Sequence, residues 1–434
     1  MTTNVAPSTA AEPSVVLVDG AGDSDTDRTP LPRPRPVPPR RRRRRKVLVL
    51  TTTFPGRPGD GIPPFVLDLS RKLSDDYELT VVTPRIPDAP ARERIGTITV
   101  ERFAYFPRRI EGVAHGATLA NVQAQPWRLP ELAALLVRFH QVAREAASRI
   151  QPDLVHAHWL LPTGVHATAA AKAAAAPLLV TIHGVDVHAL PVRPLEMLRR
   201  WTLRRTDHAV AVSSSLAGRI EALSPTTTVD TVPMGANLDE VPADFARHPE
   251  PGLLGFVGRL AEKKGVSVLL DALAAAPDLR LVIAGDGPDR EALEAQTRRL
   301  RLDERVEFWG HADRDRVYDL LSRCESLVIP SVVARDGDQE GTPVVLAEAV
   351  ALGVPVIASR LGGIADHLDE ESGWLTEPGD PQGLATTLAH AHGSPIEREA
   401  RATTARKLVS PLLTLDGTAE AYADLYRKLT GGRR

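Results

Sequence analysis

Two acidic and two basic side chains have the types and the spacing needed to bind a sugar that is joined to a diphosphate. Glu340 and Glu348 stand eight positions apart, and Arg259 and Lys264 lie upstream of them. A departing diphosphate gains negative charge, and cations fixed beside it stabilise the transition state more than the ground state. Arginine binds phosphate as a bidentate fork, and lysine binds it as a point charge. With the acids holding hydroxyls of a ribose and a sugar, the four residues predict a nucleotide-sugar site.

The segment between the two acids adds backbone groups that suit phosphate. Pro343 is expected at the start of a helix, where its missing N–H group would have no partner anyway. Gly341 and Thr342 then lie just before a helix N-terminus, where backbone N–H groups point at anions. Glu340 is expected in the loop before this helix, and Glu348 about one and a half turns into it.

Each of these residues also has a plain structural interpretation. Arg259 and Lys264 can be surface cations at an ordinary strand end, and Lys263 is the neighbouring alternative to Lys264. Glu348 can be an acid on a helix surface, and Glu340 can be a loop carboxylate beside other acids. The presence of all four together favours the functional interpretation. Lys264 is preferred because it directly precedes a glycine.

Two glycine-containing turns follow predicted strands. Gly285-Asp286-Gly287-Pro288 lacks the third glycine of a dinucleotide fingerprint, because Arg290 stands in its place, so the match is weak. We interpret it as a strand-to-helix turn near the nucleotide, with Gly287 at the donor site. Gly59-Asp60-Gly61 follows the first strand, where glycine lets the backbone approach a ligand closely. A purely structural turn is the alternative for each.

Histidines gather in the first half of the chain. Alternation places His156 and His158 on one face of a strand. No carboxylate or cysteine spacing completes a metal site with them, so no metal is expected. His183 and Asp186 follow another strand at its carboxyl end, where open α/β sheets bind ligands, and His183 can donate a hydrogen bond to a sugar hydroxyl. The alternative for His183 is a packed polar residue in a loop.

The elements that position these residues alternate between strands and helices. The first set comprises strands at 47–54, 77–82, 97–103, 154–157, 178–182 and 208–212, with helices at 65–73, 129–149 and 164–175. After a linker around 240–252 the pattern restarts, with strands at 253–260, 279–287, 306–310, 326–331, 355–359 and 373–377 and helices at 265–276, 288–300 and 313–324. This alternation predicts an α/β protein with two successive doubly wound parallel sheets.

Length and charge bound the organisation of the chain. Its 434 residues suggest two or three units. The first 46 residues hold ten Lys/Arg and five Asp/Glu, but the whole chain has a formal charge of -2, which argues against a nucleic-acid partner. We predict a disordered Pro/Arg-rich tail at 1–45, an N-terminal domain at 46–245, a C-terminal domain at 246–409, and a helix in 410–434, around 418–429, that packs back toward the N-terminal domain.

The tail and the cysteine content bear on location. Six arginines, Arg40–Arg45, end the tail, which is either a solvated extension or an anchor for an anionic membrane surface. Cys324 is the only cysteine, so a disulfide framework is impossible and the cytoplasm is the simplest compartment. No apolar run approaches the roughly 20 residues that cross a bilayer.

From residue 46 to about residue 429, the chain resembles the retaining glycosyltransferases of family four, which have the GT-B fold. The E-x7-E signature of that family is matched by Glu340 and Glu348. Its diphosphate clamp is matched by Arg259 and Lys264. The resemblance implies two Rossmann-like domains that face a central cleft, with the acceptor held by the N-terminal domain and the donor by the C-terminal domain.

The first half of the chain carries the remaining family motifs. The HGxD element is matched by His183, Gly184 and Asp186, and the first glycine loop by Asp60-Gly61. The resemblance places Asp186 and His158 on the acceptor side. In the family's element after this domain, Asn237 stands where many relatives carry Asp.

The resemblance also implies roles for the matched residues. Glu348 would hold the ribose hydroxyls, Glu340 would contact the donor sugar, Gly61 would approach the phosphates, and His183 would approach the transferred sugar. It implies a hexosyl group moved with retention of anomeric configuration, without a metal or any other cofactor. The catalytic set is then Arg259, Lys264, Glu340 and His183.

The segment around Glu340 is further similar to enzymes that build exopolysaccharides or lipid-linked glycans. A glycan or a lipid-linked glycan is therefore the expected acceptor, and such acceptors are often membrane-bound. The arginine pairs Arg108-Arg109, Arg199-Arg200 and Arg204-Arg205 suit peripheral contact with an anionic membrane, at the inner face of the cell membrane. Solvent-exposed helix faces are the alternative.

The sequence leaves two other functions open. A nucleotide-sugar epimerase on the same fold would need an acid–base set around the sugar and no acceptor pocket. A non-catalytic nucleotide-sugar-binding protein would bind the donor and transfer nothing. The intact clamp together with the paired glutamates favours the transferase.

Overall fold

The computed structural model describes residues 43–431, apart from 58–61, 63, 116–117, 119–120, 123–124, 185–186, 188–191 and 336. The predicted site residues Gly61 and Asp186, and residues 1–42 of the predicted tail, therefore lie outside the described residues. Contacts divide the chain into residues 1–43 and residues 44–434, and both sheets belong to the second unit.

The first half of this unit contains eight strands. Its elements are β1 (Arg45–Leu50), α1 (Phe65–Leu73), β2 (Tyr77–Pro84), β3 (Arg92–Ile95), β4 (Ile98–Phe103), α3 (Leu129–Ile150), β5 (Leu154–His158), α4 (Val165–Ala174), β6 (Leu178–Ile182), α6 (Arg193–Leu203), β7 (His208–Ala211), α7 (Ser214–Leu223) and β8 (Val229–Thr231). The strand order is β3-β4-β2-β1-β5-β6-β7-β8, and only the β3–β4 pair is antiparallel. The sequence does not predict β3, because its RERI segment is polar and none of it is buried.

Alternating side chains place the two faces of this sheet in separate cores. In β1, Leu48 and Leu50 pack with α3, α4, α6 and α7. Val47 and Val49, which point the opposite way, pack with α1 and with the last helix, α15 (Leu415–Gly431). A parallel strand covered on both faces should be apolar throughout, and β1 is buried from Val47 to Leu50.

The second half of the unit contains six parallel strands. Its elements are β9 (Leu253–Val257), α8 (Val266–Ala274), β10 (Arg280–Ala284), α9 (Arg290–Arg299), β11 (Val306–Gly310), α10 (Arg314–Arg323), β12 (Ser326–Ile329), α11 (Val344–Ala351), β13 (Val356–Ser359), α12 (Gly362–Ala365), β14 (Trp374–Thr376), α13 (Pro381–Gly393) and α14 (Pro395–Leu408). The strand order is β11-β10-β9-β12-β13-β14. Leu254 and Phe256 of β9 pack with α8, α9 and α13, whereas Leu253 packs with α10, α11 and α14. The sequence therefore predicts the α/β fold class with two doubly wound sheets correctly.

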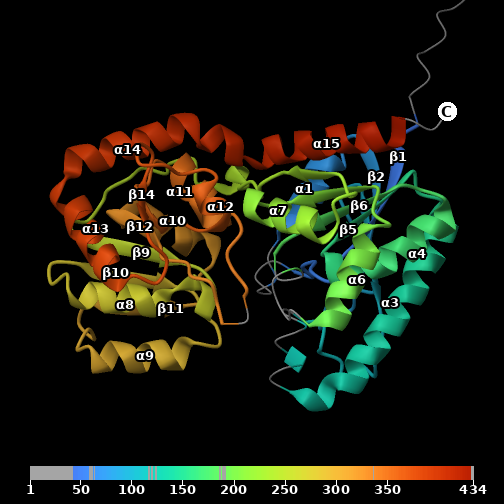
Figure 1. The fold of residues 1–434 in the computed structure, drawn as a ribbon, viewed down its shortest axis with the longest axis horizontal. Helices are drawn as coiled ribbons and strands as arrows, with labels where there is room; N and C mark the ends of the chain where they lie inside the picture. The colour runs from blue at the N-terminus through green and yellow to red at the C-terminus, as the bar shows by residue number, and fades with distance from the viewer. Residues whose placement is uncertain are drawn as a thin grey trace, which may run out of the picture. The chain divides into compact units, whose positions relative to one another are not determined.

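Helix α15 packs on the first sheet, although the second sheet precedes it in the chain (Figure 1). Tyr422 and Tyr426 of this helix are almost fully buried. The Tyr426 hydroxyl lies 2.7 Å from Nδ1 of His156, and the Tyr422 hydroxyl lies 2.8 Å from the Thr181 hydroxyl. The helix is longer than the predicted 418–429. The boundaries of the predicted domains stay predictions.

Three strands end at least three residues earlier than the apolar runs in the sequence predict. β1 ends at residue 50 rather than 54, β9 at 257 rather than 260, and β10 at 284 rather than 287. Beyond β9 and β10 the two backbones bond irregularly: Leu260 N–H donates to the Asp286 carbonyl at 2.9 Å, and the Leu260 carbonyl accepts from Asp289 N–H at 3.2 Å. Arg259 and Gly287 therefore lie in loops after the strands and not within them.

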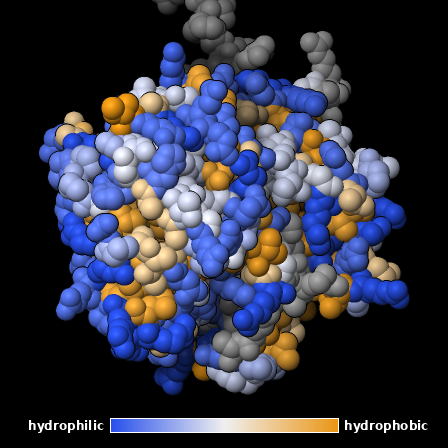
Figure 2. All heavy atoms as spheres, turned by 60° about the vertical axis from the view of Figure 1, so that its left-hand side comes forward, coloured by the Kyte–Doolittle hydropathy of each residue, from blue (hydrophilic) through white to orange (hydrophobic). Residues whose placement is uncertain are grey.

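The surface is mostly hydrophilic on the face drawn in Figure 2, where hydrophobic residues form small separate patches. Met197 and Trp127 are large apolar residues that are well exposed. Within the described ranges, no helix is both long enough and apolar enough to cross a bilayer.

Candidate functional site

The loops at the carboxyl ends of β9, β10 and β12 are bonded to one another through their backbones. The turn after β10 accepts from and donates to Leu260, as described above, and Val332 N–H donates to the Lys263 carbonyl at 2.9 Å. The carboxyl ends of parallel strands are where open α/β sheets bind ligands. Predicted donor-site residues from separate parts of the sequence thus meet at one edge of the second sheet.

Glycines allow these loops to approach each other at backbone distance. A Cβ atom added to Gly285 would lie 1.8 Å from the Gly258 carbonyl oxygen, and one added to Gly287 would lie 2.2 Å from the Leu260 carbonyl oxygen. Gly265 has a φ of +66° and would place a Cβ 1.8 Å from the Pro330 carbonyl oxygen. The GDG turn after β10 therefore packs directly against the loop of Arg259 and holds that loop in place, and its position at the donor site stays a prediction.

Lys264 and Glu340 form an ion pair between the β9 loop and the segment before α11. The Glu340 side chain is only 12% exposed and the Lys264 side chain 17% exposed. Burial alone would raise the pKa of Glu340, but the charges of Lys264 and Lys263 outweigh it and hold that pKa below its usual value. The alternative residue Lys263 is also paired, with Asp338 at 2.9 Å. Two lysines and two carboxylates therefore neutralise each other across these loops.

Arg259 differs from the two lysines in having no carboxylate partner. Its side chain is exposed, and it makes no hydrogen bond or ion pair with any residue that the structure describes. Burial and the charge of Glu262 raise the pKa of Asp289, and the charge of Arg259 partly offsets them, so Arg259 lies near Asp289. The structure does not join Arg259 to Lys264, but it leaves the guanidinium open to an anion.

The segment around α11 holds the remaining predicted donor residues. Glu348 is the fifth residue of α11 and is buried, so it is not the surface acid that was its alternative. Helix α11 begins at Val344, and Pro343 precedes it in an extended conformation with ψ 133°, so Pro343 is the residue before the helix and not its first. Gly341 lies close to Val212, and the Thr342 hydroxyl donates to the Val212 carbonyl at 3.1 Å.

Three histidines form a cluster, two on β5 and one directly after β6. Nδ1 of His158 lies 3.2 Å from Nε2 of His183, and both nitrogens of His156 are used, by Tyr426 and by Thr181. Burial lowers the pKa of His158 to about 3. Burial and the neighbouring histidines lower the pKa values of His156 and His183 well below 6.5. All three rings are therefore neutral near pH 7, and His183, only half-buried, is the one placed to meet a ligand.

Two aromatic residues that no sequence motif identified lie beside His183. The rings of Trp159 and Phe65 lie 4.5 and 4.9 Å from the His183 ring. Trp159 directly follows β5, and its φ of 78° is rare for a residue other than glycine. Its indole N–H is buried and has no acceptor among the described residues. The sequence feature that could have identified Trp159 is its position as an aromatic residue at the carboxyl end of a central strand.

No group of three His, Cys, Asp or Glu side chains suited to a metal ion occurs among the residues that the structure describes. In the histidine cluster, ring nitrogens contact each other, Thr181 and Tyr426 instead.

Sequence comparisons match both halves of the chain to known families. Residues 59–240 match the pattern described as Glycosyltransferase Family 4, and residues 239–408 match Glycosyl transferases group 1. A glycogen synthase of Mycobacterium tuberculosis H37Rv is 30% identical over 303 residues, which are 65% of this chain and 70% of the relative. The putative colanic acid biosynthesis glycosyltransferase WcaL of Escherichia coli K12 is 28% identical over 263 residues, 57% of this chain and 63% of WcaL.

A solved structure shares the fold of the whole two-sheet unit. The structure of Anabaena Alr3699/HepE in complex with UDP-glucose aligns with a TM-score of 0.65 at 20% identity, covering 89% of this chain and 100% of HepE. The fold is therefore GT-B. None of the comparisons supports an epimerase or a non-catalytic binding protein.

Replacing Gly285 by alanine tests the close packing of the donor loops. Because the new Cβ would overlap the Gly258 carbonyl, the loops must separate, and we expect Gly285→Ala to lower the free energy of unfolding by about 1–3 kcal/mol. Gly218 in α7 is the matched control, since a Cβ there meets nothing within 4 Å and alanine should stabilise the helix by about 0.5–1 kcal/mol. Urea unfolding measures both, and equal effects would contradict the packing.

The histidine cluster predicts a loss of stability in acid. Unfolded histidines take up protons below about pH 6.5, whereas the buried ones stay neutral until much lower pH, so the stabilisation is complete above 6.5 and declines below it. Each such histidine contributes a slope of about 1.4 kcal/mol per pH unit. Urea unfolding over a pH series gives the slope of the free energy of unfolding against pH. For His158→Gln this slope should correspond to about one bound proton fewer than in the wild type, while the exposed control His311→Gln should match the wild type. An unchanged slope in His158→Gln would disprove the neutral cluster.

Proposed function

We infer the reaction from the family and the site together: this chain belongs to the group 1 glycosyl transferases and is a glycosyltransferase. We propose that it moves a hexosyl group from a nucleotide-diphosphate sugar to a hydroxyl of a glycan or lipid-linked glycan. The observation that carries the proposal is the Lys264–Glu340 ion pair at the carboxyl end of the second sheet, in the same β9 loop that exposes the guanidinium of Arg259.

The donor diphosphate is proposed to bind between Arg259 and Lys264. Arg259 can bind the diphosphate without breaking an ion pair, because it makes none in the described part of the chain. Lys264 can bind a phosphate oxygen while Glu340 turns to a hydroxyl of the donor sugar. Buried Glu348 would hold the ribose hydroxyls, as a carboxylate accepts from two neighbouring O–H groups. Complexes with UDP-glucose are known for HepE, so UDP-glucose is the first donor to try.

Retention of configuration is proposed with the leaving phosphate as the base. The bond from the anomeric carbon to the phosphate oxygen breaks, the acceptor oxygen bonds to the same face of that carbon, and the acceptor proton passes to the phosphate. Arg259 and Lys264 would neutralise the charge that develops on the diphosphate. In other enzymes a bound metal ion has this role. We propose that this chain needs no metal or other cofactor.

The acceptor is proposed to enter beside His183 on the first sheet. A neutral imidazole can donate one hydrogen bond and accept another, which suits a sugar hydroxyl. Trp159 offers an aromatic ring and an indole N–H beside it. WcaL is named for colanic acid biosynthesis, and a glycan acceptor is consistent with both that relative and the glycogen synthase.

We propose that the protein works in the cytoplasm, at the inner face of the membrane. Helix α6 exposes Met197 by 71% and Trp201 by 39%, and the Arg205 guanidinium lies 4.2 Å from the Trp201 ring centroid. Apolar and aromatic residues beside arginines on one helix surface suit an anionic lipid interface. This contact would bring the enzyme to a lipid-linked acceptor.

The donor site is tested by Lys264→Ala and Glu348→Ala. We expect each to lower nucleotide-sugar affinity or kcat/KM at least about tenfold, because a charge-assisted contact is lost. A thermal-shift screen of nucleotide sugars, starting with UDP-glucose, identifies the donor, and calorimetry and turnover then measure the variants. Exposed Lys172→Ala and Glu420→Ala are matched controls that should behave as wild type. Wild-type binding and turnover in both site variants would refute the assignment.

The membrane contact is tested by vesicle sedimentation. The double variant Met197→Ala/Trp201→Ala should bind vesicles containing phosphatidylglycerol at least about tenfold more weakly than wild type, because each buried apolar side chain contributes about 1–3 kcal/mol. Ile396→Ala on α14 is the control, since Ile396 is 87% exposed and lies on another helix. Equal binding by the double variant and wild type would exclude α6 as the docking surface.

A further inference from the structure

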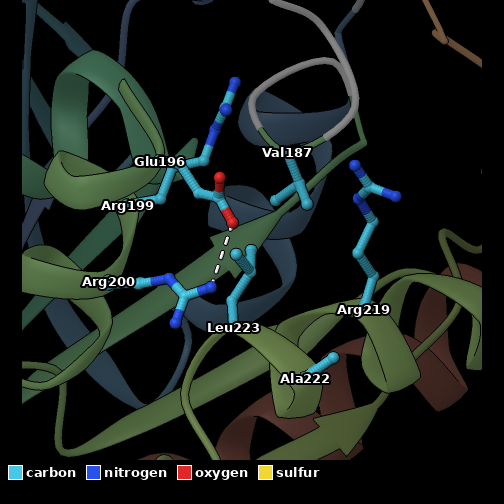
Figure 3. Close-up of a pocket in the computed structure, with 7 residues that line it drawn as sticks. All are labelled: Val187, Glu196, Arg199, Arg200, Arg219, Ala222 and Leu223. Atoms are coloured by element: carbon cyan, nitrogen blue, oxygen red, sulfur yellow. Dashed lines mark hydrogen bonds and ion pairs between the residues drawn. The ribbon is translucent and has the colours of Figure 1, made fainter. Parts of the chain in front are cut away.

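A cavity of about 250 Å³ lies between α6 and α7 (Figure 3). Val187, four residues after His183, forms part of its wall. The other lining residues are Glu196, Arg199 and Arg200 of α6 and Arg219, Ala222 and Leu223 of α7. The cavity is therefore on the first sheet, on the side of the molecule proposed for the acceptor.

The cavity carries more positive than negative charge. Three arginines line it and one carboxylate, Glu196, which pairs with Arg200 of the next helical turn at 3.0 Å. Figure 3 shows that Arg219 comes from α7, on the opposite side of the cavity from this pair. Arg219 makes no hydrogen bond or ion pair with any described residue. Its guanidinium is thus held near the cavity without a counter-charge in the described part of the chain.

A second cavity of similar size differs in that all of its lining arginines are paired. That cavity, of about 270 Å³, lies between β4 and α3 and is lined by four arginines and two glutamates. Each of its arginines has a carboxylate within 4 Å, in the pairs Arg92–Glu101, Arg102–Glu93, Arg138–Glu145 and Arg149–Glu101. Because each arginine of this cavity is already paired with a carboxylate, an anion would gain little binding energy there.

We propose that the cavity between α6 and α7 binds the phosphate group of the acceptor, a proposal that rests on the proposed function. Arginine forks match phosphate oxygens, and two arginines from different helices can hold one phosphate from both sides. The volume lies below the roughly 300–1,000 Å³ of sites that enclose drug-sized ligands. It suits a phosphate or diphosphate group. The phosphate would anchor the acceptor while its sugar reaches toward His183.

The test uses inorganic pyrophosphate as the probe and the full chain. Calorimetry at fixed ionic strength compares wild type, Arg219→Gln and Arg219→Lys. Because the donor loops also attract this anion, the same set is repeated with Lys264→Ala, so that losses at the two places are measured separately. Arg144→Gln on α3 is the matched control, since Arg144 is equally exposed and likewise makes no ion pair among the described residues.

We expect Arg219→Gln to weaken pyrophosphate binding about tenfold, as loss of one charge-assisted contact does, and Arg219→Lys to weaken it less. Arg144→Gln should change nothing. Equal effects of Arg219→Gln and Arg144→Gln, or no effect of either, would overturn the proposal. Because Arg219 is exposed, its loss should not unfold the protein, and an unchanged urea midpoint verifies this.

A second arm identifies the source of the phosphate. Vesicles of phosphatidylcholine with a minority of phosphatidic acid are sedimented with the same variants. If Arg219→Gln also weakens vesicle binding beyond Arg144→Gln, the cavity takes a lipid phosphate. If only pyrophosphate binding falls, it takes a soluble phosphorylated acceptor. Nucleotide-sugar binding by wild type is measured independently, so a failed donor assignment and a failed phosphate site give different results.

Discussion

The close approach of backbone to backbone after β9 and β10 is the constraint on which the donor site depends. Gly285 against the Gly258 carbonyl and Gly265 against the Pro330 carbonyl leave no space for a side chain. Loops from three strands can therefore touch directly, and Lys264, which precedes Gly265, is brought to Glu340. A looser contact would leave these side chains to span the gap, with more rotamer freedom to lose on binding.

Charge balance explains how so many ionised groups persist in those loops before a donor binds. A buried charge without a partner costs several kcal/mol, whereas a paired one is tolerated. Lys264 with Glu340 and Lys263 with Asp338 satisfy this condition within the protein. Arg259 belongs to neither of these ion pairs, and its side chain is exposed to solvent. In the proposed site, a diphosphate would bind Arg259 without breaking an ion pair among the described residues, and would reach Lys264 by displacing Glu340, which would then bind the donor sugar.

Much of the fold follows from local sequence, and the contacts of the site follow from it only in part. Apolar, β-branched runs predict the buried parallel strands, because such strands must be apolar on both faces. These runs do not determine at which residue the hydrogen bonding between strands ends. Arg259 was therefore expected at the end of a strand, whereas it lies in the loop that follows. The polar strand β3 gave no signal at all. The bond from His156 to Tyr426 spans 270 positions, a distance over which no periodicity carries information.

The two sheets differ in the kind of polar group that they place at their ligand-facing ends. The second sheet presents charged residues, Arg259, Lys264 and Glu340, that can follow the charge of a diphosphate. The first presents His158 and His183, which burial keeps neutral. Neutral rings can orient hydroxyls through hydrogen bonds, but near pH 7 they carry no positive charge to neutralise a diphosphate. In the proposed reaction, the charged residues of the second sheet would stabilise the leaving group and the histidines of the first would orient the acceptor. Helix α15, through Tyr426 and its neighbour, holds this histidine cluster in place.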